Sequence, residues 1–391
     1  MDASVERNSS RKLLFLITED WFFLSHFLER ALAAQADGFE IVVAGRDNGS
    51  ADLIRREGIV FHTLPFDRRS MNLFSELHLL WRIVQLYAAE QPTIVHHLAL
   101  KPILLGSIAA RLNGIRRIVN APLGMGYIFT SSDLRARFVR PLVWLAIRMV
   151  INPRGSKVIF ENEEDLEELI GAKAVQKSDA VLIRGAGVDL SQFSPAPIPP
   201  GDPVVLVVSR MLYDKGIGDF VEAARLLRSQ NVAGRFWLVG APDAGNPSSI
   251  SQSILEQWSA EGIIEWFKQR DDVPTLMRKA SIVCLPSYRE GMPKVLLEAL
   301  AVGRAIVACD VIGCRELVTD GTDGFLVSPR NPLALAAAIR RLLEDSALCA
   351  TFGAAGRQKA VRQFSSHTVS SATLAIYSGM LQASPPVTQH S

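Results

Sequence analysis

The sequence has few cysteines, and they form no regular framework. All four lie in the second half of the 391-residue chain, at Cys284, Cys309, Cys314 and Cys349. This usage is typical of reduced cytosolic proteins. Cys309 and Cys314 are spaced loosely like metal ligands, but no second pair or nearby histidine completes a zinc set, and no Asp-x-Asp motif is present. We therefore expect neither a bound metal ion nor another cofactor.

Excess charge and long apolar runs are also lacking. Lysine and arginine number 42 against 40 aspartates and glutamates, and no RNA-binding or zinc-finger signature is present, so we expect no nucleic-acid partner. No uninterrupted apolar run approaches the roughly 20 residues that cross a bilayer. Glu19 and Asp20 interrupt the first apolar run, which is therefore interpreted as a strand and not as a signal peptide. These features predict a cytoplasmic protein.

Short apolar runs alternate with longer helical patterns along the whole chain. Such alternation predicts right-handed βαβ units around parallel sheets. A chain of this length with 48% hydrophobic residues can bury two cores, so we expect an α/β protein with two Rossmann-like domains. The predicted strands are residues 13–17, 40–44, 93–96, 117–119, 157–160 and 180–183, then 204–208, 236–239, 263–266, 282–285 and 305–308.

Prolines dominate residues 194–203, where they oppose both helix continuation and strand pairing. We expect a stiff linker there, with one domain over residues 1–195, a second over 196–365 and a tail over 366–391. Ligands of open parallel sheets bind outside the carboxyl ends of the strands. We therefore expect the site in a cleft between the two domains.

Two glutamates lie on either side of a predicted turn. Glu290 follows a buried strand, and Pro293, with its pre-set φ and missing amide hydrogen, is predicted as the first residue of a helix that stops at Gly303. The free amides of such a first turn form a site for phosphate oxygens. Glu298 lies about 7.5 Å further along the helix axis, within reach of a ribose.

Two cations flank the loop after the strand at residues 204–208. Arg210 and Lys215 can converge there on one diphosphate and stabilise the charge of a departing nucleoside diphosphate. Gly240 follows the next strand. It either lets a ligand approach the backbone closely or forms a plain turn.

In the first half, His96, His97 and Lys101 follow a strand, and Gly124 and Tyr127 belong to a turn after the next strand. Either histidine could orient a sugar hydroxyl, and Lys101 could meet an acceptor phosphate. The alternative is that the histidines are structural.

Residues 133–157 combine six basic residues with one apolar stripe. This pattern fits a helix on an anionic membrane surface, and it fits a packed helix with solvated arginines equally well. The acidic run at residues 161–168 is predicted to be a solvated helix face.

Together these motifs resemble the family 4 retaining glycosyltransferases of the GT-B type, in which two Rossmann-like domains face one another. The matching stretches are residues 208–210, 215–216, 270–274, 285–298, 313–316 and 323–327, with weaker matches at 101, 124–129, 160–162 and 187–189. The weaker matches are similar to members that extend polyprenyl-diphosphate-linked sugars for surface polysaccharide or glycoprotein synthesis.

The resemblance implies roles for the residues already singled out. Glu290 would face the donor sugar, Glu298 the donor ribose, and Arg210 and Lys215 the diphosphate. It also implies that a last helix from about residue 366 crosses back to the first domain. Further donor-binding residues are expected at Gly291, Met292, Pro293, Val295 and Gly240.

The predicted function is metal-independent transfer of a hexose or N-acetylhexosamine from a nucleotide sugar, UDP-linked, to a lipid-linked glycan. A sugar-nucleotide epimerase of the same architecture and a non-catalytic scaffold of a polysaccharide assembly complex are the alternatives. A dehydrogenase is disfavoured because neither half begins with a G-x-G-x-x-G turn.

Two stretches depart from the family pattern. Residues 18–23 replace the glycine-rich turn that many relatives have after the first strand. Lys268 stands where a glycine often follows Trp266 and Phe267. The acceptor-side backbone contact and the recognition of the base are therefore expected to differ.

Overall fold

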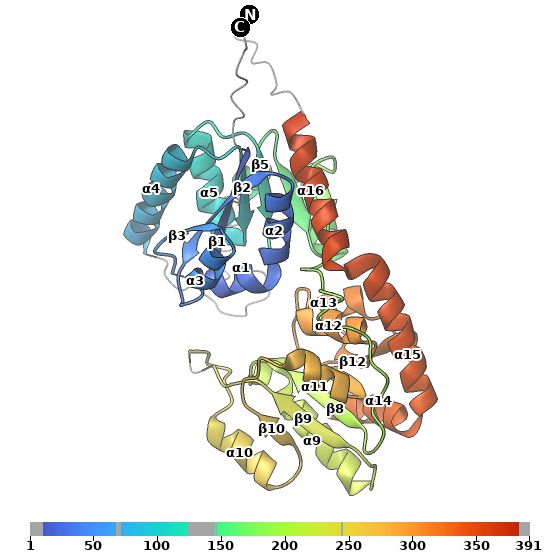
Figure 1. Ribbon diagram of the computed structural model, residues 1–391. Coiled ribbons are helices and arrows are strands. Elements are labelled where there is room, and N and C mark those ends of the chain that lie inside the picture. Colours follow the sequence, from blue (N-terminus) through green and yellow to red (C-terminus); the bar gives the residue numbers. More distant parts are fainter. Residues whose placement is uncertain (1–10, 68–71, 124–144, 146, 244, 383–391) are drawn as a thin grey trace, which may run out of the picture. The chain divides into compact units, whose positions relative to one another are not determined.

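The structure, a computed structural model, describes residues 11–67, 72–123, 145, 147–243 and 245–382 (Figure 1). The chain divides into two compact units. Residues up to Ile183, together with those from Val369 onward, form unit 1, and Arg184–Thr368 form unit 2.

Unit 1 is built on a seven-stranded parallel sheet with the order β3-β2-β1-β4-β5-β6-β7. The strands are β1 (Arg11–Glu19), β2 (Phe39–Arg46), β3 (Val60–Thr63), β4 (Ile94–Leu98), β5 (Ile118–Ala121), β6 (Lys157–Phe160) and β7 (Ala180–Leu182). Its helices include α1 (Asp20–His26), α2 (Leu28–Ala36), α3 (Ala51–Arg56), α4 (Leu73–Glu90), α5 (Leu100–Leu112), α8 (Glu163–Gly171) and α16 (Ser366–Gln382).

Alternate residues of β1 enter two different cores. Leu13 and Phe15 pack with residues of α1, α2, α3 and α16, whereas Leu14 and Leu16 pack with residues of α4 and α5. Figure 1 shows α2 and α16 on one side of the sheet and α4 and α5 on the other. Because both faces are covered, β1 carries a continuous buried apolar run from Leu13 to Ile17, as is typical of strands in parallel sheets.

Unit 2 repeats this plan with a six-stranded parallel sheet in the order β10-β9-β8-β11-β12-β13. The strands are β8 (Val204–Val208), β9 (Arg235–Val239), β10 (Glu265–Phe267), β11 (Ile282–Leu285), β12 (Ala305–Cys309) and β13 (Gly324–Val327). One face packs against α11 (Val273–Lys279), α12 (Lys294–Val302), α13 (Ile312–Leu317) and η2 (Ala360–Phe364). The other packs against α9 (Ile217–Ser229), α10 (Gln252–Ala260), α14 (Pro332–Glu344) and α15 (Ser346–Lys359).

The prediction of two Rossmann-like parallel sheets is confirmed. Every predicted strand is present within about two residues, but β3 and β13 were missed. Both are outermost strands of their sheets, and in β3 only one residue of four is fully buried. An outer strand that is partly exposed lacks the continuous apolar run by which the central strands were found.

The proline-rich segment is attached to unit 2 by Arg304. This buried side chain donates hydrogen bonds to the carbonyl oxygens of Ala196 and Pro197, at 2.8 and 3.1 Å, and also to those of Met277 and Arg278. Residues 196–197 are therefore fixed to the body of unit 2. None of the described helices combines the length and the hydrophobicity that crossing a bilayer requires.

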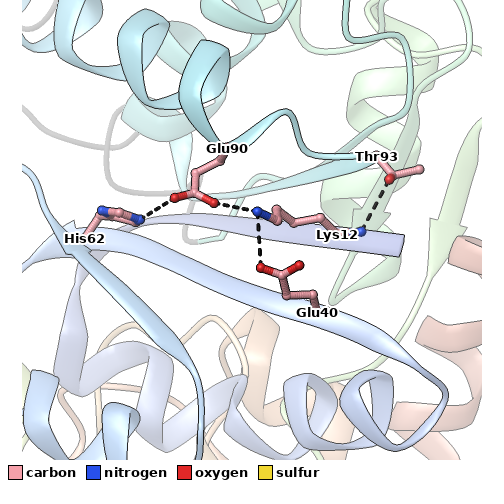
Figure 2. A network of polar contacts seen from close by, with 5 residues as sticks. All are labelled: Lys12, Glu40, His62, Glu90 and Thr93. Atoms are coloured by element: carbon pink, nitrogen blue, oxygen red, sulfur yellow. Dashed lines mark hydrogen bonds and ion pairs between the residues drawn. The ribbon is translucent and has the colours of Figure 1, made fainter. Parts of the chain in front are cut away.

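Polar contacts fix the last residue of α4 to the sheet of unit 1, as Figure 2 shows. Glu90 accepts hydrogen bonds from Lys12 on β1 and His62 on β3, each at 2.8 Å, and Lys12 also contacts Glu40 on β2 at 3.1 Å. One carboxylate thus joins the end of α4 to two strands directly and to a third through Lys12.

Candidate active site

The strand, turn and helix predicted around Glu290 are present as β11, residues 286–293 and α12. Gly303 ends α12 in the left-handed conformation with φ 77°, as expected. The predicted position of Pro293 is wrong by one residue, because Pro293 is the N-cap with extended ψ 113°. Its carbonyl accepts a 3.0 Å hydrogen bond from the amide of Leu296, so α12 starts one residue later.

The structure brings Glu290 and Lys215 together. Lys215 Nζ donates a hydrogen bond to Glu290 Oε1 across 2.6 Å. Lys215 ends the short helix η1 (Tyr213–Lys215) after β8, and Glu290 lies in the loop after the neighbouring strand β11. Their side chains are 21% and 11% exposed, so water weakens the attraction less than at an open surface.

Backbone contacts hold these two loops in register. Gly216 has φ 68°, and a Cβ atom there would lie 2.0 Å from the carbonyl oxygen of Pro286, so no other residue fits. The amide of Tyr288 donates to the carbonyl of Asp214 at 3.0 Å. The amide of Gly313, in α13, donates to the carbonyl of Glu290 at 3.3 Å. The loops after three strands therefore support the backbone of Glu290.

Arg210 lies in the same loop as Lys215 but pairs with a different carboxylate. Its guanidinium donates to Asp243 Oδ2 at 2.8 Å, and the side chain is largely exposed. Asp243 follows β9, which neighbours β8 in the sheet. The sequence analysis missed Asp243 because only its position at a strand's carboxyl end could have indicated it. Convergence of Arg210 and Lys215 on one diphosphate stays a prediction.

Gly240 lies where the loops after β8, β9 and β10 meet. Its φ is +139°, and a Cβ atom there would lie 1.9 Å from the carbonyl oxygen of Ser209. Its amide donates to the carbonyl of Phe267 at 3.1 Å, and its own carbonyl accepts from Trp266 Nε1 at 2.9 Å. This glycine has a structural requirement of its own, so its proposed contact with a donor stays a prediction.

Glu298 is nearly buried on α12, with 12% of its side chain exposed. Burial raises the pKa of its carboxyl to about 7, and the ammonium of Lys294, 3.8 Å away, only partly opposes this rise. The group therefore exchanges its proton near neutral pH. A carboxyl group that is partly protonated at neutral pH can both donate hydrogen bonds to and accept them from hydroxyl groups of a ligand.

The other residues predicted to bind the donor differ in what they can offer. Gly291 is exposed, and the space around its Cα is open. Met292 and Val295 instead pack against the core of unit 2. Met292 is buried, so its contact with a donor would come from its backbone amide, whereas the side chain of Val295 is only partly buried.

The two histidines of β4 are fully buried in unit 1. His97 Nε2 and Nδ1 form hydrogen bonds with Tyr87 Oη at 2.9 Å and Asn120 Oδ1 at 2.8 Å. His96 Nδ1 bonds to Tyr377 Oη of α16 at 2.7 Å. Burial lowers the pKa of both rings, that of His97 to about 4, so both are neutral. Contact of either ring with an acceptor would require local rearrangement.

Lys101 lies in the first turn of α5, just after β4. Its ammonium donates to Glu76 Oε1 of α4 at 2.5 Å and to the carbonyl of Asp67 at 2.7 Å. Gly124 and Tyr127 lie outside the described residues, as does most of the basic stretch 133–157. The acceptor side of the site therefore stays a prediction.

The acidic run at residues 161–168 is only partly the solvated face that the sequence predicted. Glu163, Glu164, Glu167 and Glu168 are exposed, but Glu161 is partly buried at the carboxyl end of β6. Burial raises the pKa of Glu161 to about 7, against the opposing effect of the buried Arg30 guanidinium.

The cysteines are all free and buried. Burial raises the pKa of the Cys309 thiol to about 12 and that of Cys349 to about 11, which suppresses thiolate chemistry. Within the described ranges, no group of three or more His, Cys, Asp or Glu side chains is placed to hold a metal ion.

Several named proteins are similar to the chain along most of its length. It is 26% identical over 342 residues to the N,N'-diacetylbacillosaminyl-diphospho-undecaprenol alpha-1,3-N-acetylgalactosaminyltransferase of Campylobacter jejuni, covering 84% of this chain and 88% of that protein. It is 26% identical over 325 residues to the UDP-Gal:alpha-D-GlcNAc-diphosphoundecaprenol alpha-1,3-galactosyltransferase of Escherichia coli, covering 79% and 81%.

The fold also matches solved structures. The Anabaena protein HepE, in complex with UDP-glucose, superimposes with a TM-score of 0.74 at 21% identity, covering 94% of this chain and 99% of that one. This match confirms the GT-B fold class. Residues 12–162 match the family model described as glycosyl transferase 4-like, and residues 202–345 match the model of glycosyl transferases group 1. The chain therefore belongs to the group 1, family 4-like glycosyltransferases.

Proposed function

We propose that this protein transfers a hexose or N-acetylhexosamine from a UDP-sugar to a lipid-linked glycan, with retention of the anomeric configuration and without a metal ion. The observation that carries the proposal is the pairing of Glu290 with Lys215 at the carboxyl edge of the unit 2 sheet. Ligands of open parallel sheets bind at this edge. It supplies a carboxylate for the sugar and an ammonium for the phosphate.

Donor binding would replace one ion pair by another. In the structure Lys215 is held by Glu290 and Arg210 by Asp243, so both cations are already positioned before a ligand arrives. A bound diphosphate carries more negative charge than one carboxylate and would compete for Lys215. Amides at the start of α12 add a favourable dipole, and Glu298 accepts hydrogen bonds from the ribose hydroxyls.

The chemistry assigned to these residues is stabilisation of charge. As the bond between the anomeric carbon and the phosphate oxygen breaks, its electron pair remains on the diphosphate, where Lys215 and Arg210 lower its energy. The acceptor hydroxyl attacks the anomeric carbon from the same face. Its proton passes to the departing phosphate oxygen, so Glu290 binds the sugar and no protein nucleophile is required.

The acceptor class is inferred from the relatives. Both of the transferases named above act on undecaprenyl-diphosphate-linked sugars, according to their names. We assign acceptor binding to unit 1, with Lys101 as the phosphate contact. Its present hydrogen bond to Glu76 would then be exchanged for the acceptor phosphate.

The test is a transfer assay on the purified protein with a panel of nucleotide sugars and a polyprenyl-diphosphate-linked acceptor, in excess EDTA. Donors are first selected by thermal stabilisation, because a bound ligand raises apparent stability. Glu290→Ala should abolish most transfer. Parental rates in Glu290→Ala with every donor would contradict the proposed site.

The same assay separates the alternatives. An epimerase would convert the donor when acceptor is omitted, and NMR of the donor would show the new sugar. A scaffold would neither bind a donor in calorimetry nor lose partner binding when Glu290, Arg210 and Lys215 are replaced together. Dependence of transfer on added metal would contradict the metal-independent part of the proposal.

A further inference from the structure

We propose that the exposed face of α4 is a membrane-binding surface of unit 1 that partitions into an anionic bilayer. The inference rests on the proposed function in one respect, because a lipid-linked acceptor would lie at such a bilayer. It goes beyond that function by assigning the contact to a helix that no sequence motif singled out.

The apolar residues of α4 occupy two faces. Leu79, Ile83 and Tyr87 form the buried face in the core of unit 1. The opposite face carries four large apolar side chains that are 54–84% exposed: Leu73, Phe74, Leu77 and Trp81. A helix on a soluble domain is expected to be polar on this side. A cluster of exposed apolar residues marks a surface that binds something.

The exposed face does not result from a loosely attached helix. The core face is fully packed, and ion pairs anchor the helix near both ends. Glu76, in the first turn, pairs with Lys101 of α5, and Glu90, the last residue, joins the network of Figure 2. The four exposed apolar residues, called the apolar stripe below, therefore lie on a helix that is fixed to unit 1.

The charge of this face fits anionic lipid headgroups. Arg82 lies on it, exposed, and within the described ranges it has no ion pair with a carboxylate. His78, one turn earlier, contacts the ring of Trp81 with the ring centroids 5.9 Å apart. The carboxylates of α4, Glu76 and Glu90, are both engaged by cations elsewhere. A helix with exposed Trp, Phe and Leu beside an exposed arginine, and with its carboxylates paired to cations, has features of helices that lie in a membrane interface.

The apolar stripe also lies close to the residue that we propose to contact the acceptor. α4 begins at the carboxyl edge of the unit 1 sheet, since it follows the parallel strand β3, and its first turn contacts Lys101 through Glu76. Leu73, Phe74 and Leu77 lie within one turn of Glu76. Lys101, the proposed acceptor contact, is thus close to the apolar end of the stripe.

The experiment is co-sedimentation with vesicles of phosphatidylcholine, with and without phosphatidylglycerol. It needs neither donor nor acceptor, so its result is independent of the proposed transferase activity. The triple variant Phe74→Ser/Leu77→Ser/Trp81→Ser should lower partitioning about tenfold or more, and Arg82→Ala about fivefold on anionic vesicles alone. The matched control is Leu53→Ser/Leu333→Ser, which removes exposed apolar residues of α3 and α14 and should bind as the parent does.

A second readout reports insertion directly. Brominated phospholipid should quench part of the parental tryptophan fluorescence, and Trp81→Phe should lose that part while still binding vesicles. Circular dichroism and thermal melting confirm that each variant is folded. Parental vesicle binding by the folded triple variant would overturn the proposal. So would lipid-independent dimerisation that the triple variant abolishes, because α4 would then be a contact between two copies.

Discussion

Lys215 and Glu290 share a 2.6 Å hydrogen bond between the loops that follow two adjacent parallel strands. In the absence of ligand each neutralises the other, so neither charge is left unpaired in a partly shielded place. The arrangement also keeps both groups where the proposed donor would need them.

Replacing Lys215 by methionine should lower kcat/KM about 100- to 1,000-fold, by analogy with the loss of one group that stabilises developing charge. The free energy of unfolding should fall by only about 1–2 kcal/mol, because Glu290 loses its partner but keeps some access to water. Steady-state kinetics and urea unfolding measure the two effects. A stable Lys215→Met enzyme with parental kinetics would show that Lys215 does not contact the leaving group.

Arg210→Ala should raise the barrier to transfer by about 3–4 kcal/mol, since it removes the second cation that we propose to contact the diphosphate. Asp243→Ala is the matched control, because it removes only the carboxylate that now holds Arg210. Donor affinity in calorimetry should be undiminished in Asp243→Ala. If both variants lost affinity equally, the ion pair would act by shaping the loop and not through the charge of Arg210.

The protonation of Glu298 predicts a pH dependence of stability. Its folded pKa of about 7 lies above the ordinary pKa of a glutamate, 4.5, so the unfolded chain loses this proton first as the pH rises. The free energy of unfolding should therefore decrease between about pH 4.5 and 7, by about 3 kcal/mol at most. Glu298→Gln should remove this decrease, as urea unfolding at about pH 5 and pH 8 would reveal.

The same group predicts a pH dependence of donor binding. Ribose hydroxyls hydrogen-bond more strongly to an ionised carboxylate than to a neutral carboxyl. The affinity for UDP should therefore rise through about pH 7 in the parent and stay level in Glu298→Gln. An identical pH profile in both proteins would place the ribose elsewhere.

Two glycines of the site should tolerate alanine very differently. At Gly240 a Cβ atom would collide with the carbonyl of Ser209, and φ is +139°, whereas at Gly291 it would meet nothing within 4 Å. Gly240→Ala should destabilise unit 2 by more than about 2 kcal/mol, and Gly291→Ala by less than about 1 kcal/mol. Thermal melting compares them. Equal stability of the two variants would contradict the backbone arrangement around Gly240.

The ionised carboxylate of Glu90 should stabilise unit 1 at pH values above the pKa of this group. Burial alone would raise the pKa of Glu90, but hydrogen bonds from Lys12 and His62 outweigh it and hold the pKa below 4.5. The stabilisation is thus present above about pH 4.5 and lost as the pH falls through the folded pKa. Glu90→Gln should cost about 1–2 kcal/mol at neutral pH and less in acid, whereas Glu344→Gln, in an exposed pair with Arg340, should cost under about 0.5 kcal/mol.

The sequence predicted the central strands and the loops at their ends well, because a buried parallel strand leaves a continuous apolar run. β11 and the residues after it illustrate this: the run, the glutamate, the proline and the terminating glycine are all local signals. The pairing of Glu290 with Lys215 was not predicted, since it depends on β8 and β11 becoming neighbours in the sheet.

The features that sequence reasoning missed depend on tertiary contacts. In the sequence nothing distinguishes Asp243 from other loop aspartates. Its contact with Arg210 exists because β8 and β9 are neighbours in the sheet. The burial of His96 depends on α16, whose Tyr377 lies 281 residues away in the chain. The apolar stripe of α4 was not predicted from the sequence, because a helix with apolar residues on two faces lacks the one-sided periodicity of an amphipathic helix.

The packing of α16 onto the sheet of unit 1 bears on the order in which the protein is completed during translation. Val369, Tyr377 and Met380 fill part of that core, yet they leave the ribosome after all of unit 2 has emerged. The half that is synthesised first therefore lacks part of the cover of one sheet face until α16 has emerged, while the half synthesised second can finish folding ahead of it.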